Sequence, residues 1–182
     1  YNQLNAAAGI GVARTLGIDE KLIVKSIKSF PGVPGRMEEI KNNRGIKIII
    51  DFAHTPNALE QVLRTLKKQK KKSSKLITVF GCAGERDVKK RPMMGEISTR
   101  LADVSIFTTE DPRSENVNKI ISQIVLGAKK NKAKEVRVIR FDESIHRYRQ
   151  HIFVRLQDRG IAIWFALNKI AQKGDIVVAC GK

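Results

Sequence analysis

Aromatic residues are scarce in this sequence of 182 residues, since they make up 5% of it whereas hydrophobic residues in total make up 42%. A core of this composition is aliphatic, built mainly from Val, Ile, Leu and Ala side chains. Long apolar runs are missing too, because none approaches the roughly 20 residues that a membrane-spanning helix requires. The composition therefore predicts a soluble protein with an aliphatic core.

Cysteine is rare as well, and the only two, Cys82 and Cys180, each lie in a glycine-containing stretch. Neither position has the spacing of a zinc site or of a disulfide framework. Reduced thiols are typical of cytoplasmic proteins, in which disulfides are uncommon. We therefore expect a cytoplasmic protein, and we predict no metal site in this chain.

An initiator Met, an export signal and a phosphate-binding G-x-x-x-x-G-K-[ST] loop are all absent from the sequence. The first residues already have the pattern of a helix interior. The last ones, VVACGK, form a strand pattern that runs into Gly181 and Lys182, where a loop would be expected to follow. Both ends read as cut, so we expect the chain to be a fragment of a longer protein.

Acidic residues are outnumbered, with 18 Asp and Glu against 35 Lys and Arg, and the formal net charge is +17. A basic surface attracts phosphates and nucleic acid. The densest basic run, KKQKKKSSK at residues 67–75, has no aromatic side chains interleaved for base stacking. This pattern favours solvated lysines and no nucleic-acid partner, although a non-catalytic nucleotide or nucleic-acid binding module stays open as an alternative.

Apolar periodicity alternates between the helical and the strand template along most of the chain. Residues 2–16 read as an Ala-rich helix, and Asp19 caps a second helix that runs to about Phe30. The segment PGVPG then breaks the chain with two prolines and two glycines. We predict a domain boundary there, between residues 1–30 and residues 31–182.

Beyond this boundary, strand-like runs alternate with helical stretches near residues 56–69, 92–102, 116–130 and 159–172. The strand-like runs are RMEEIK, IKIIIDF, KLITVFG, DVSIFTT, VRVIRF and DIVVACG. Such alternation predicts an α/β fold with a Rossmann-like, mostly parallel sheet flanked by helices. The stretch HRYRQHIFVRLQ, residues 146–157, reads as an extended connection between the fifth strand and the last helix.

Polar residues directly follow four of the strand-like runs. AHTP follows IKIIIDF, CAGERD follows KLITVFG, EDPR follows DVSIFTT, and CGK follows DIVVA. Ligands of open α/β sheets bind outside the carboxyl ends of the strands, so these loops predict a ligand site at one edge. Within AHTP, Thr55 and Pro56 also make an ordinary helix start, as an N-cap followed by a proline at the first helical position.

These motifs also carry a resemblance that covers nearly the whole chain. The segments YNQLNAAAGIGVA, FPGVPGRME, DFAHTPNAL, VFGCAGERDVKKRPMMG, TTEDPRSEN and VVACGK occur in the order and spacing found in Mur ligases, which the sequence resembles. The resemblance implies that residues 1–30 close a central ATPase domain. Residues 31–182 would be the C-terminal, amino-acid-delivering domain, which stops before its own end.

The activity implied by the resemblance is an ATP-dependent ligation in peptidoglycan synthesis. ATP and Mg²⁺ would activate a carboxylate as an acyl-phosphate, which the amine of the incoming amino acid then attacks. The implied partners are a UDP-N-acetylmuramoyl dipeptide and a diamino acid, in a cytoplasmic and monomeric enzyme without a membrane partner. Because the phosphate-binding loop and the complete catalytic set are not in this chain, we expect the chain alone to be inactive.

Four residues match nucleotide-binding positions of the family: Asn5, Arg36, Asp51 and His54. The resemblance implies that Asn5 contacts the adenine, that Arg36 and His54 approach the phosphates, and that Asp51 binds ribose hydroxyls. Taken alone, Asn5 would be an ordinary helix-surface residue and Arg36 a solvated arginine after a turn. These assignments therefore depend on the resemblance.

A second set matches the positions that bind the incoming amino acid: Arg86, Glu110, Asp111, Pro112, Arg113 and Gly181. Arg86 would hold one of its carboxylates, and Gly181 would begin a G-K-G-H-E loop whose glutamate is not in this chain. Arg113 belongs to EDPR, at the position where relatives that add meso-diaminopimelate typically have D-N-P-R. There the arginine pairs with the distal carboxylate of the substrate.

The first two residues of EDPR depart from this pattern. Glu110 replaces Asp, and Asp111 replaces Asn, which removes an amide donor and adds negative charge. A distal ammonium would tolerate that charge better than a carboxylate would. Arg113 favours meso-diaminopimelate, while an L-lysine-adding homologue and a related ligase of the folylpolyglutamate or cyanophycin type stay open.

Overall fold

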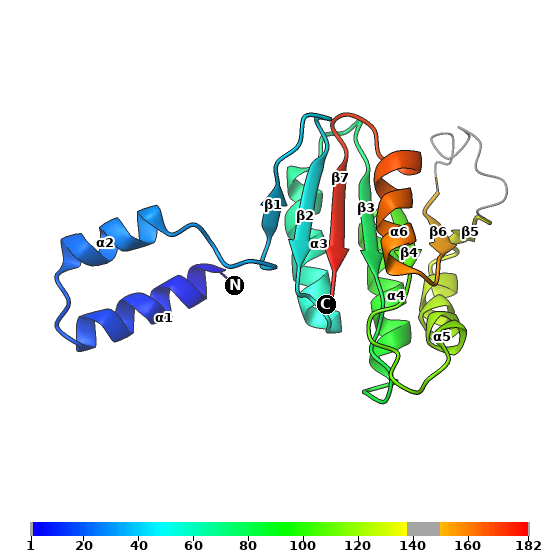
Figure 1. The fold of residues 1–182 in the computed structure, drawn as a ribbon, viewed down its shortest axis with the longest axis horizontal. Coiled ribbons are helices and arrows are strands. Elements are labelled where there is room, and N and C mark those ends of the chain that lie inside the picture. The colour runs from blue at the N-terminus through cyan, green and yellow to red at the C-terminus, as the bar shows by residue number, and fades with distance from the viewer. Residues whose placement is uncertain (1, 138–149, 182) are drawn as a thin grey trace. The chain divides into compact units, whose positions relative to one another are not determined.

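The computed structural model describes residues 2–137 and 150–181 of the chain. Contacts divide the chain into two compact units, Tyr1–Val33 and Pro34–Lys182, and the division falls within the PGVPG segment (Figure 1). Proline and glycine interrupt both helical and strand pairing, which is why the chain separates there.

The first unit is a pair of helices, α1 (Asn2–Thr15) and α2 (Glu20–Ser29). Asp19 caps α2 as predicted, since its carboxylate accepts hydrogen bonds from two backbone N–H groups in the first turn of the helix. Among residues 3–33 only Ile23 is buried. This unit therefore has almost no hydrophobic core of its own.

The second unit contains the sheet, in which seven strands within the described ranges pair in the order β1-β2-β7-β3-β4-β6-β5. β1 is antiparallel to β2, and every other pair of neighbours is parallel. The predicted α/β fold with a mostly parallel sheet is confirmed. The strands are β1 (Glu38–Ile40), β2 (Lys47–Asp51), β3 (Leu76–Phe80), β4 (Val104–Phe107), β5 (Lys134–Glu135), β6 (Ile152–Arg155) and β7 (Ile176–Cys180).

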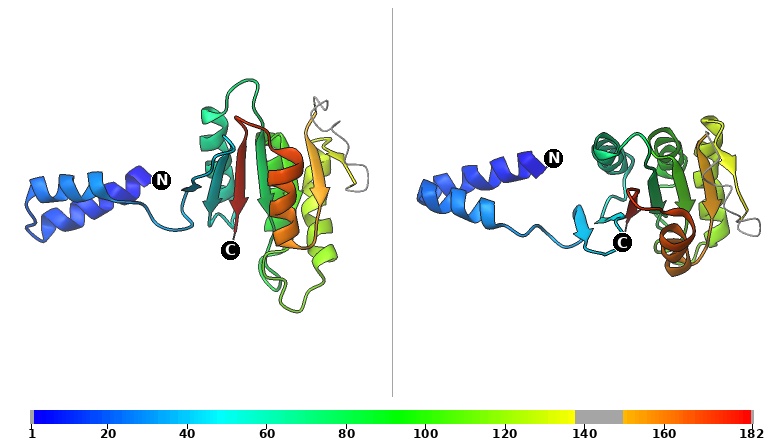
Figure 2. Two further views of the ribbon diagram at one scale, coloured as in Figure 1. Left: turned by 45° about the horizontal axis from the view of Figure 1, so that its top comes forward. Right: turned by 90° about the horizontal axis from the view of Figure 1, so that it is seen from above.

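Helices cover both faces of this sheet (Figure 2). On one face lie α3 (Pro56–Gln69), α4 (Lys90–Leu101) and α5 (Val117–Lys130), and on the other lies α6 (Arg159–Phe165), which continues as the π-helical turn η3 (Ala166–Ile170). The central strands β3, β4 and β7 are buried along their whole length, as parallel strands between two helical layers must be.

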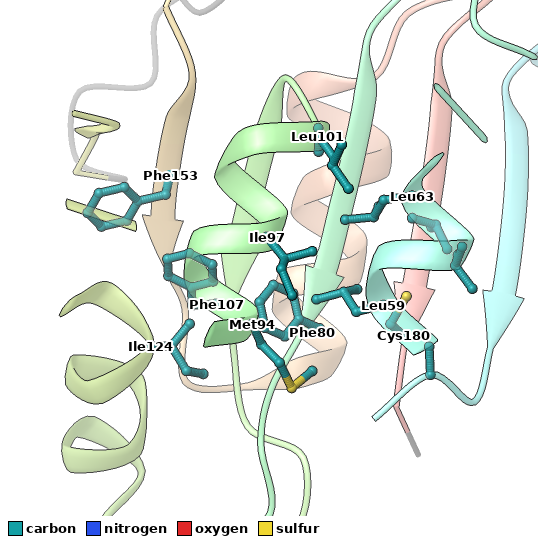
Figure 3. Close-up of a cluster of buried hydrophobic side chains, with 14 of the residues drawn as sticks. Leu59, Leu63, Phe80, Met94, Ile97, Leu101, Phe107, Ile124, Phe153 and Cys180 are labelled. Carbon is teal, nitrogen blue, oxygen red and sulfur yellow. The ribbon is translucent and has the colours of Figure 1, made fainter. Parts of the chain in front are cut away.

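Two hydrophobic clusters fill the space between the layers. The larger one joins the three helices on the first face to the sheet, and its aromatic centre is a row of rings from neighbouring strands (Figure 3). Phe80 packs edge-on against Phe107, and Phe107 stacks on Phe153, with 5.4 Å between ring centroids in each pair. These three rings add volume to an otherwise mainly aliphatic core.

The stretch expected to be a connection, residues 146–157, contains a strand instead. Its first part lies outside the described residues, but Ile152–Arg155 form β6, which pairs with both β4 and β5. Ile152, Phe153 and Val154 are all buried. A short apolar run that is covered on both faces shows no alternation, so periodicity alone did not distinguish it.

The expected strand VRVIRF, residues 136–141, is described only as far as Arg137, and the strand found in this part of the chain is Lys134–Glu135. Val136 and Arg137 are not assigned to a strand, and the rest of the expected strand lies outside the described residues. Val136 still continues the pairing by one bond, because its N–H donates to the carbonyl oxygen of Phe153 at 2.9 Å.

Two glycines set the distance between α4 and α5. A Cβ atom on Gly127 would lie 1.7 Å from the carbonyl oxygen of Pro92, and one on Gly95 would lie 2.0 Å from that of Ile124. Only glycine permits backbones to approach this closely. The contact holds the first turn of α4, which begins with Lys90, in a defined position near the carboxyl ends of the strands.

Candidate functional site

The carboxyl ends of β2, β7, β3 and β4 lie side by side, as predicted. Register pairs Asp51 with Cys180, Val79 with Ala179, and Phe80 with Phe107, so the strands end together. We call this the carboxyl edge, formed by the residues that follow these four strands, 52–55, 81–87, 108–115 and 181. It is the place where a doubly wound sheet exposes loop backbone and polar side chains to a ligand.

The buried carboxylate of Asp51 stabilises the backbone at the carboxyl edge. It is 1% exposed, and its Oδ1 and Oδ2 accept hydrogen bonds from the backbone N–H groups of Ala53 (2.8 Å) and Met37 (2.9 Å). Burial of a carboxylate is tolerated when backbone donors satisfy it. The carboxylate therefore fastens the segment after PGVPG to the end of β2, and a direct contact with ribose hydroxyls would require this loop to open.

Three side chains line up on the surface of that segment. The guanidinium of Arg36 lies 4.6 Å from the centroid of the Phe52 ring, and this ring lies 4.9 Å from the ring of His54. The carbonyl oxygen of Phe52 can only accept, so the Nδ1 of His54, 3.0 Å away, donates to it. Arg36 and His54, two of the predicted nucleotide residues, are thus brought to one surface.

The loop after β2 ends as the sequence predicts. Thr55 caps α3 by accepting a hydrogen bond from the N–H of Ala58, and Pro56 follows at the first helical position. The carbonyl oxygen of His54 accepts a 2.8 Å hydrogen bond from Nζ of Lys90, which is only 8% exposed. Lys90 thereby joins the loop after β2 to the start of α4.

The loop after β3 is in close contact with the EDPR segment. The N–H of Gly84 donates to the carbonyl oxygen of Asp111 at 2.8 Å, and a Cβ on Gly84 would lie 2.0 Å from the carbonyl oxygen of Pro112. The N–H of Glu85 donates to Oε1 of Glu115 at 2.5 Å. The two loops predicted to receive the amino acid are therefore one joined surface.

A buried arginine supports that surface. Arg91 is 0% exposed, and its Nη atoms make two 2.8 Å hydrogen bonds to the carboxylate of Glu115, with further bonds to Gln123 and to the carbonyl oxygen of Ala83. The side-chain hydrogen bond from Arg91 is the main reason that the pKa of Glu115 falls to about 2. Sequence analysis did not single out either residue, because an arginine beside a proline-containing helix start usually lies on the surface.

Arg113 and Arg86 both lie exposed on the joined surface. Arg113 has a left-handed backbone (φ 49°), and its Nη1 lies 4.0 Å from Oε2 of Glu85. Asp111 is exposed and Pro112 is half-buried. Asn5 belongs to the first unit, where its side chain is exposed on α1.

Glu110 lies deeper at the carboxyl edge, beside Gly181. A Cβ on Gly181, whose φ is +84°, would lie 3.4 Å from Cδ of Glu110. Burial raises the pKa of Glu110, and the nearby side chains of Lys90, His54 and Arg159 oppose that rise. Its Oε2 is buried without a hydrogen-bond partner among the described residues.

Arg159, which sequence analysis missed, completes this cluster from the start of α6. Its Nη2 donates a 3.0 Å hydrogen bond to the carbonyl oxygen of Cys180, the last residue of β7. Burial lowers the pKa of the guanidinium, and Glu110 opposes the change. Glu110 is therefore influenced by two cations, Lys90, which bonds to the loop after β2, and Arg159, which bonds to the end of β7.

The donor set of the carboxyl edge fits an anionic ligand. Arg36, His54, Arg86 and Arg113 offer cationic or N–H groups to phosphates and carboxylates. Within the described ranges, no group of three or more His, Cys, Asp or Glu side chains is arranged to hold a metal ion.

Cys82 and Cys180 are buried and free, and burial raises the pKa of each to about 12.

In the part of the chain that the structure describes, no helix has the length and apolar character needed to cross a bilayer.

The sequence pattern of one protein family, described as the Mur ligase glutamate ligase domain, matches residues 35–182. The chain belongs to the Mur ligase family. Its match begins one residue after Pro34, at which the second compact unit starts. The resemblance read from the sequence motifs is thereby confirmed.

Several relatives in this family carry the name UDP-N-acetylmuramoyl-L-alanyl-D-glutamate--2,6-diaminopimelate ligase. The protein of Alkaliphilus metalliredigens (strain QYMF) is 38% identical, and that of Syntrophomonas wolfei subsp. wolfei (strain DSM 2245B / Goettingen) is 39% identical, each over 182 residues. All of this chain is covered in both cases, but only 33% of the relative. The chain thus spans about a third of the length of these relatives.

Solved structures agree with this placement. A structure named for the same diaminopimelate ligase is 35% identical, with a TM-score of 0.64, and the match covers 100% of this chain and 33% of that one. The UDP-N-acetylmuramate-alanine ligase from Thermotoga maritima, at 20% identity, has a TM-score of 0.66 over 99% of this chain and 34% of its own. The latter likeness shows the fold alone.

Proposed function

We propose that this chain is the C-terminal part of an ATP-dependent Mur ligase that adds the third residue, meso-diaminopimelate, to UDP-N-acetylmuramoyl-L-Ala-D-Glu. The observation that carries the proposal is the 36–40% identity to proteins named for this reaction, over essentially the whole chain. The exposed guanidinium of Arg113, on the joined surface of the GERD and EDPR loops, supports the choice of amino acid.

The domain assignment follows from the same proposal. Residues 1–30 would be the last helices of the central ATPase domain, and residues 31–182 would be the C-terminal domain. A pair of helices with a single buried side chain among residues 3–33 is in keeping with an element that packs on a larger domain. We propose a monomeric enzyme in the cytoplasm, where nucleotide-linked precursors and ATP are available.

The proposed reaction has two steps. A carboxylate oxygen of the UDP-dipeptide attacks the γ-phosphorus of ATP, the bond from that phosphorus to the ADP oxygen breaks, and an acyl-phosphate forms. The neutral amine of the amino acid then attacks the acyl carbon, loses a proton, and expels inorganic phosphate. Bringing these anions together costs Coulomb repulsion, which Mg²⁺ and cationic side chains offset.

On the nucleotide side, the residues of this chain would bind and orient. Arg36 and His54 would face the phosphates, and Asn5 would face the adenine through an amide that both donates and accepts. Asp51 would act through its two backbone hydrogen bonds, which hold Arg36 and His54 on one surface. Its assignment to ribose hydroxyls belongs to the same proposal and requires the loop to open.

On the amino-acid side, two arginines would each bind one carboxylate of the substrate. Arg86 would hold one carboxylate, and Arg113 would pair with the distal one, where a planar guanidinium gives bidentate recognition. Glu110, Asp111, Pro112 and Gly181 would shape the pocket around them. L-lysine has no distal carboxylate, so its binding would leave the guanidinium of Arg113 without a substrate partner.

The test is substrate choice in the complete ligase that contains this chain. Phosphate release is measured with ATP, the UDP-dipeptide, and either meso-diaminopimelate or L-lysine. We expect a preference for meso-diaminopimelate of several orders of magnitude, and we expect Arg113→Ala to remove most of it while the KM for ATP changes little. Equal or better use of L-lysine by the unmodified enzyme would overturn the choice of amino acid.

One observation favours L-lysine as the second candidate. Asp111 is an exposed carboxylate beside Arg113, where a family amide would be neutral, and it would attract a distal ammonium. In that case Asp111→Asn would weaken L-lysine binding and strengthen meso-diaminopimelate binding. The same pair of substrates in the same assay distinguishes the two readings.

A further inference from the structure

Glu85 and Arg113 face each other across the joined loops in an unusual backbone state. Both have left-handed backbones, with φ angles of 52° and 49°, although neither is a glycine. Such conformations persist when neighbouring contacts hold them. Here the N–H of Glu85 is held by Oε1 of Glu115, which is itself held by the buried Arg91.

The carboxylate of Glu85 is oriented as well as its backbone. Oε1 accepts hydrogen bonds from the backbone N–H of Ser114, at 3.3 Å, and from the Ser114 hydroxyl. Its other oxygen, Oε2, is left to face Nη1 of Arg113 at 4.0 Å. A carboxylate of this chain therefore stands beside the guanidinium to which we assign the distal carboxylate of the amino acid.

We propose that Glu85 is a specificity-determining residue. Its carboxylate pairs with Arg113 before the amino acid binds, and a carboxylate of the incoming amino acid then displaces it. This inference rests on the proposed function, because it takes Arg113 as the receptor for that group. The 4.0 Å separation and the partial exposure of both side chains, 37% for Arg113 and 46% for Glu85, make the ion pair easy to displace.

The consequence for selectivity follows from charge alone. When an amino acid without a distal carboxylate binds, Arg113 keeps Glu85 as a partner, so the penalty for an unpaired guanidinium is reduced. When meso-diaminopimelate binds, its carboxylate must compete with Glu85. Glu85 therefore weakens binding of the acidic substrate and limits discrimination against L-lysine.

The test uses Glu85→Gln in the complete ligase, since glutamine keeps an oxygen that accepts from Ser114 but carries no charge. We expect the KM for meso-diaminopimelate to fall by about two- to fivefold, the range of an exposed ion pair. The KM for L-lysine should not fall, so the preference rises by the same factor, and the KM for ATP should stay constant. Glu96→Gln is the matched control, because it removes the same charge from an exposed pair between Glu96 on α4 and Lys130 on α5.

A double-mutant cycle separates pairing from a general change in charge. In an Arg113→Ala background, Glu85→Gln should no longer alter the KM for meso-diaminopimelate, because the group through which it acts is gone. An equal effect in both backgrounds, or no effect in the unmodified enzyme, would overturn the role of Glu85 alone. If Arg113→Ala leaves substrate preference unchanged, the assignment of Arg113 fails, and this inference fails with it.

Discussion

Lys90, the first residue of α4, donates a 2.8 Å hydrogen bond from Nζ to the carbonyl oxygen of His54, in the loop after β2. A charged side chain that is only 8% exposed needs such a partner, because an isolated ammonium is costly to bury. The same ammonium lies close enough to Glu110 to lower its pKa against the effect of burial. Lys90 therefore connects the proposed nucleotide loop to the proposed amino-acid loop.

Replacing Lys90 by Met should destabilise the second unit. Loss of a hydrogen bond from a charged donor predicts a decrease of about 1.5–3 kcal/mol in the free energy of unfolding. Urea unfolding followed by the fluorescence of Trp164, the only tryptophan of the sequence, reports on this unit. Lys89→Met is the matched control, since Lys89 is an exposed neighbour; equal losses from the two variants would contradict the role given to Lys90.

Asp51→Ala should cost stability in the isolated chain, because it leaves the N–H groups of Met37 and Ala53 without their acceptor. A buried donor that loses its partner costs about 1–3 kcal/mol, and the same urea titration measures the sum. In the complete ligase we also expect the KM for ATP to rise, since Arg36 and His54 lose their common support. A variant with unchanged unfolding but a raised KM for ATP would instead favour direct contact between Asp51 and the nucleotide.

Gly84→Ala should force the two amino-acid loops apart. The added Cβ would lie 2.0 Å from a backbone carbonyl oxygen, which cannot rotate away as a flexible side chain can. Overpacking of this kind costs about 1–3 kcal/mol, and in the complete ligase the KM for the amino acid should rise more than that for ATP. Gly9→Ala in α1, where nothing lies within 4 Å, is the control, and it should not lower the midpoint of the Trp164 transition.

Acidification should remove the contribution of the Arg91–Glu115 pair. The pKa of Glu115 is about 2 in the folded chain, below its ordinary value of 4.5, so the folded state favours the ionised carboxylate. The stabilisation is complete above about pH 4.5 and is lost as the pH falls from there toward 2. Measured as unfolding midpoints, the difference between the unmodified chain and Glu115→Gln should therefore be large at pH 7 and shrink near pH 3.

The exposed pair of Glu96 and Lys130 provides the control for that experiment. Its side chains are 41% and 66% exposed, so the pair contributes little to stability, and Glu96→Gln should shift the midpoint only slightly at either pH. A difference between the unmodified chain and Glu115→Gln that stays constant with pH would contradict the ionic origin of the effect.

Local sequence determined which elements form and where many of them start. Asp19 and Thr55 cap helices because their side chains reach backbone N–H groups two or three residues away, an interaction that needs no tertiary context. The alternation of strand and helix patterns determined a parallel sheet, and a parallel sheet brings the ends of its strands to one edge. The motifs AHTP, GERD and EDPR could therefore be assigned to a common site.

Tertiary structure alone decided how those motifs are held. Asp51 and Met37 are 14 residues apart, Arg91 and Glu115 are 24 apart, and Glu85 and Ser114 are 29 apart, so no local pattern encodes these contacts. The strand β6 was missed for a related reason, since its three apolar residues can be recognised as a strand only from their pairing with β4 and their burial on both faces. Hydrogen-bond partners and burial are properties of the packed chain, and they determine which polar residues brace the site and which remain on its surface to meet a ligand.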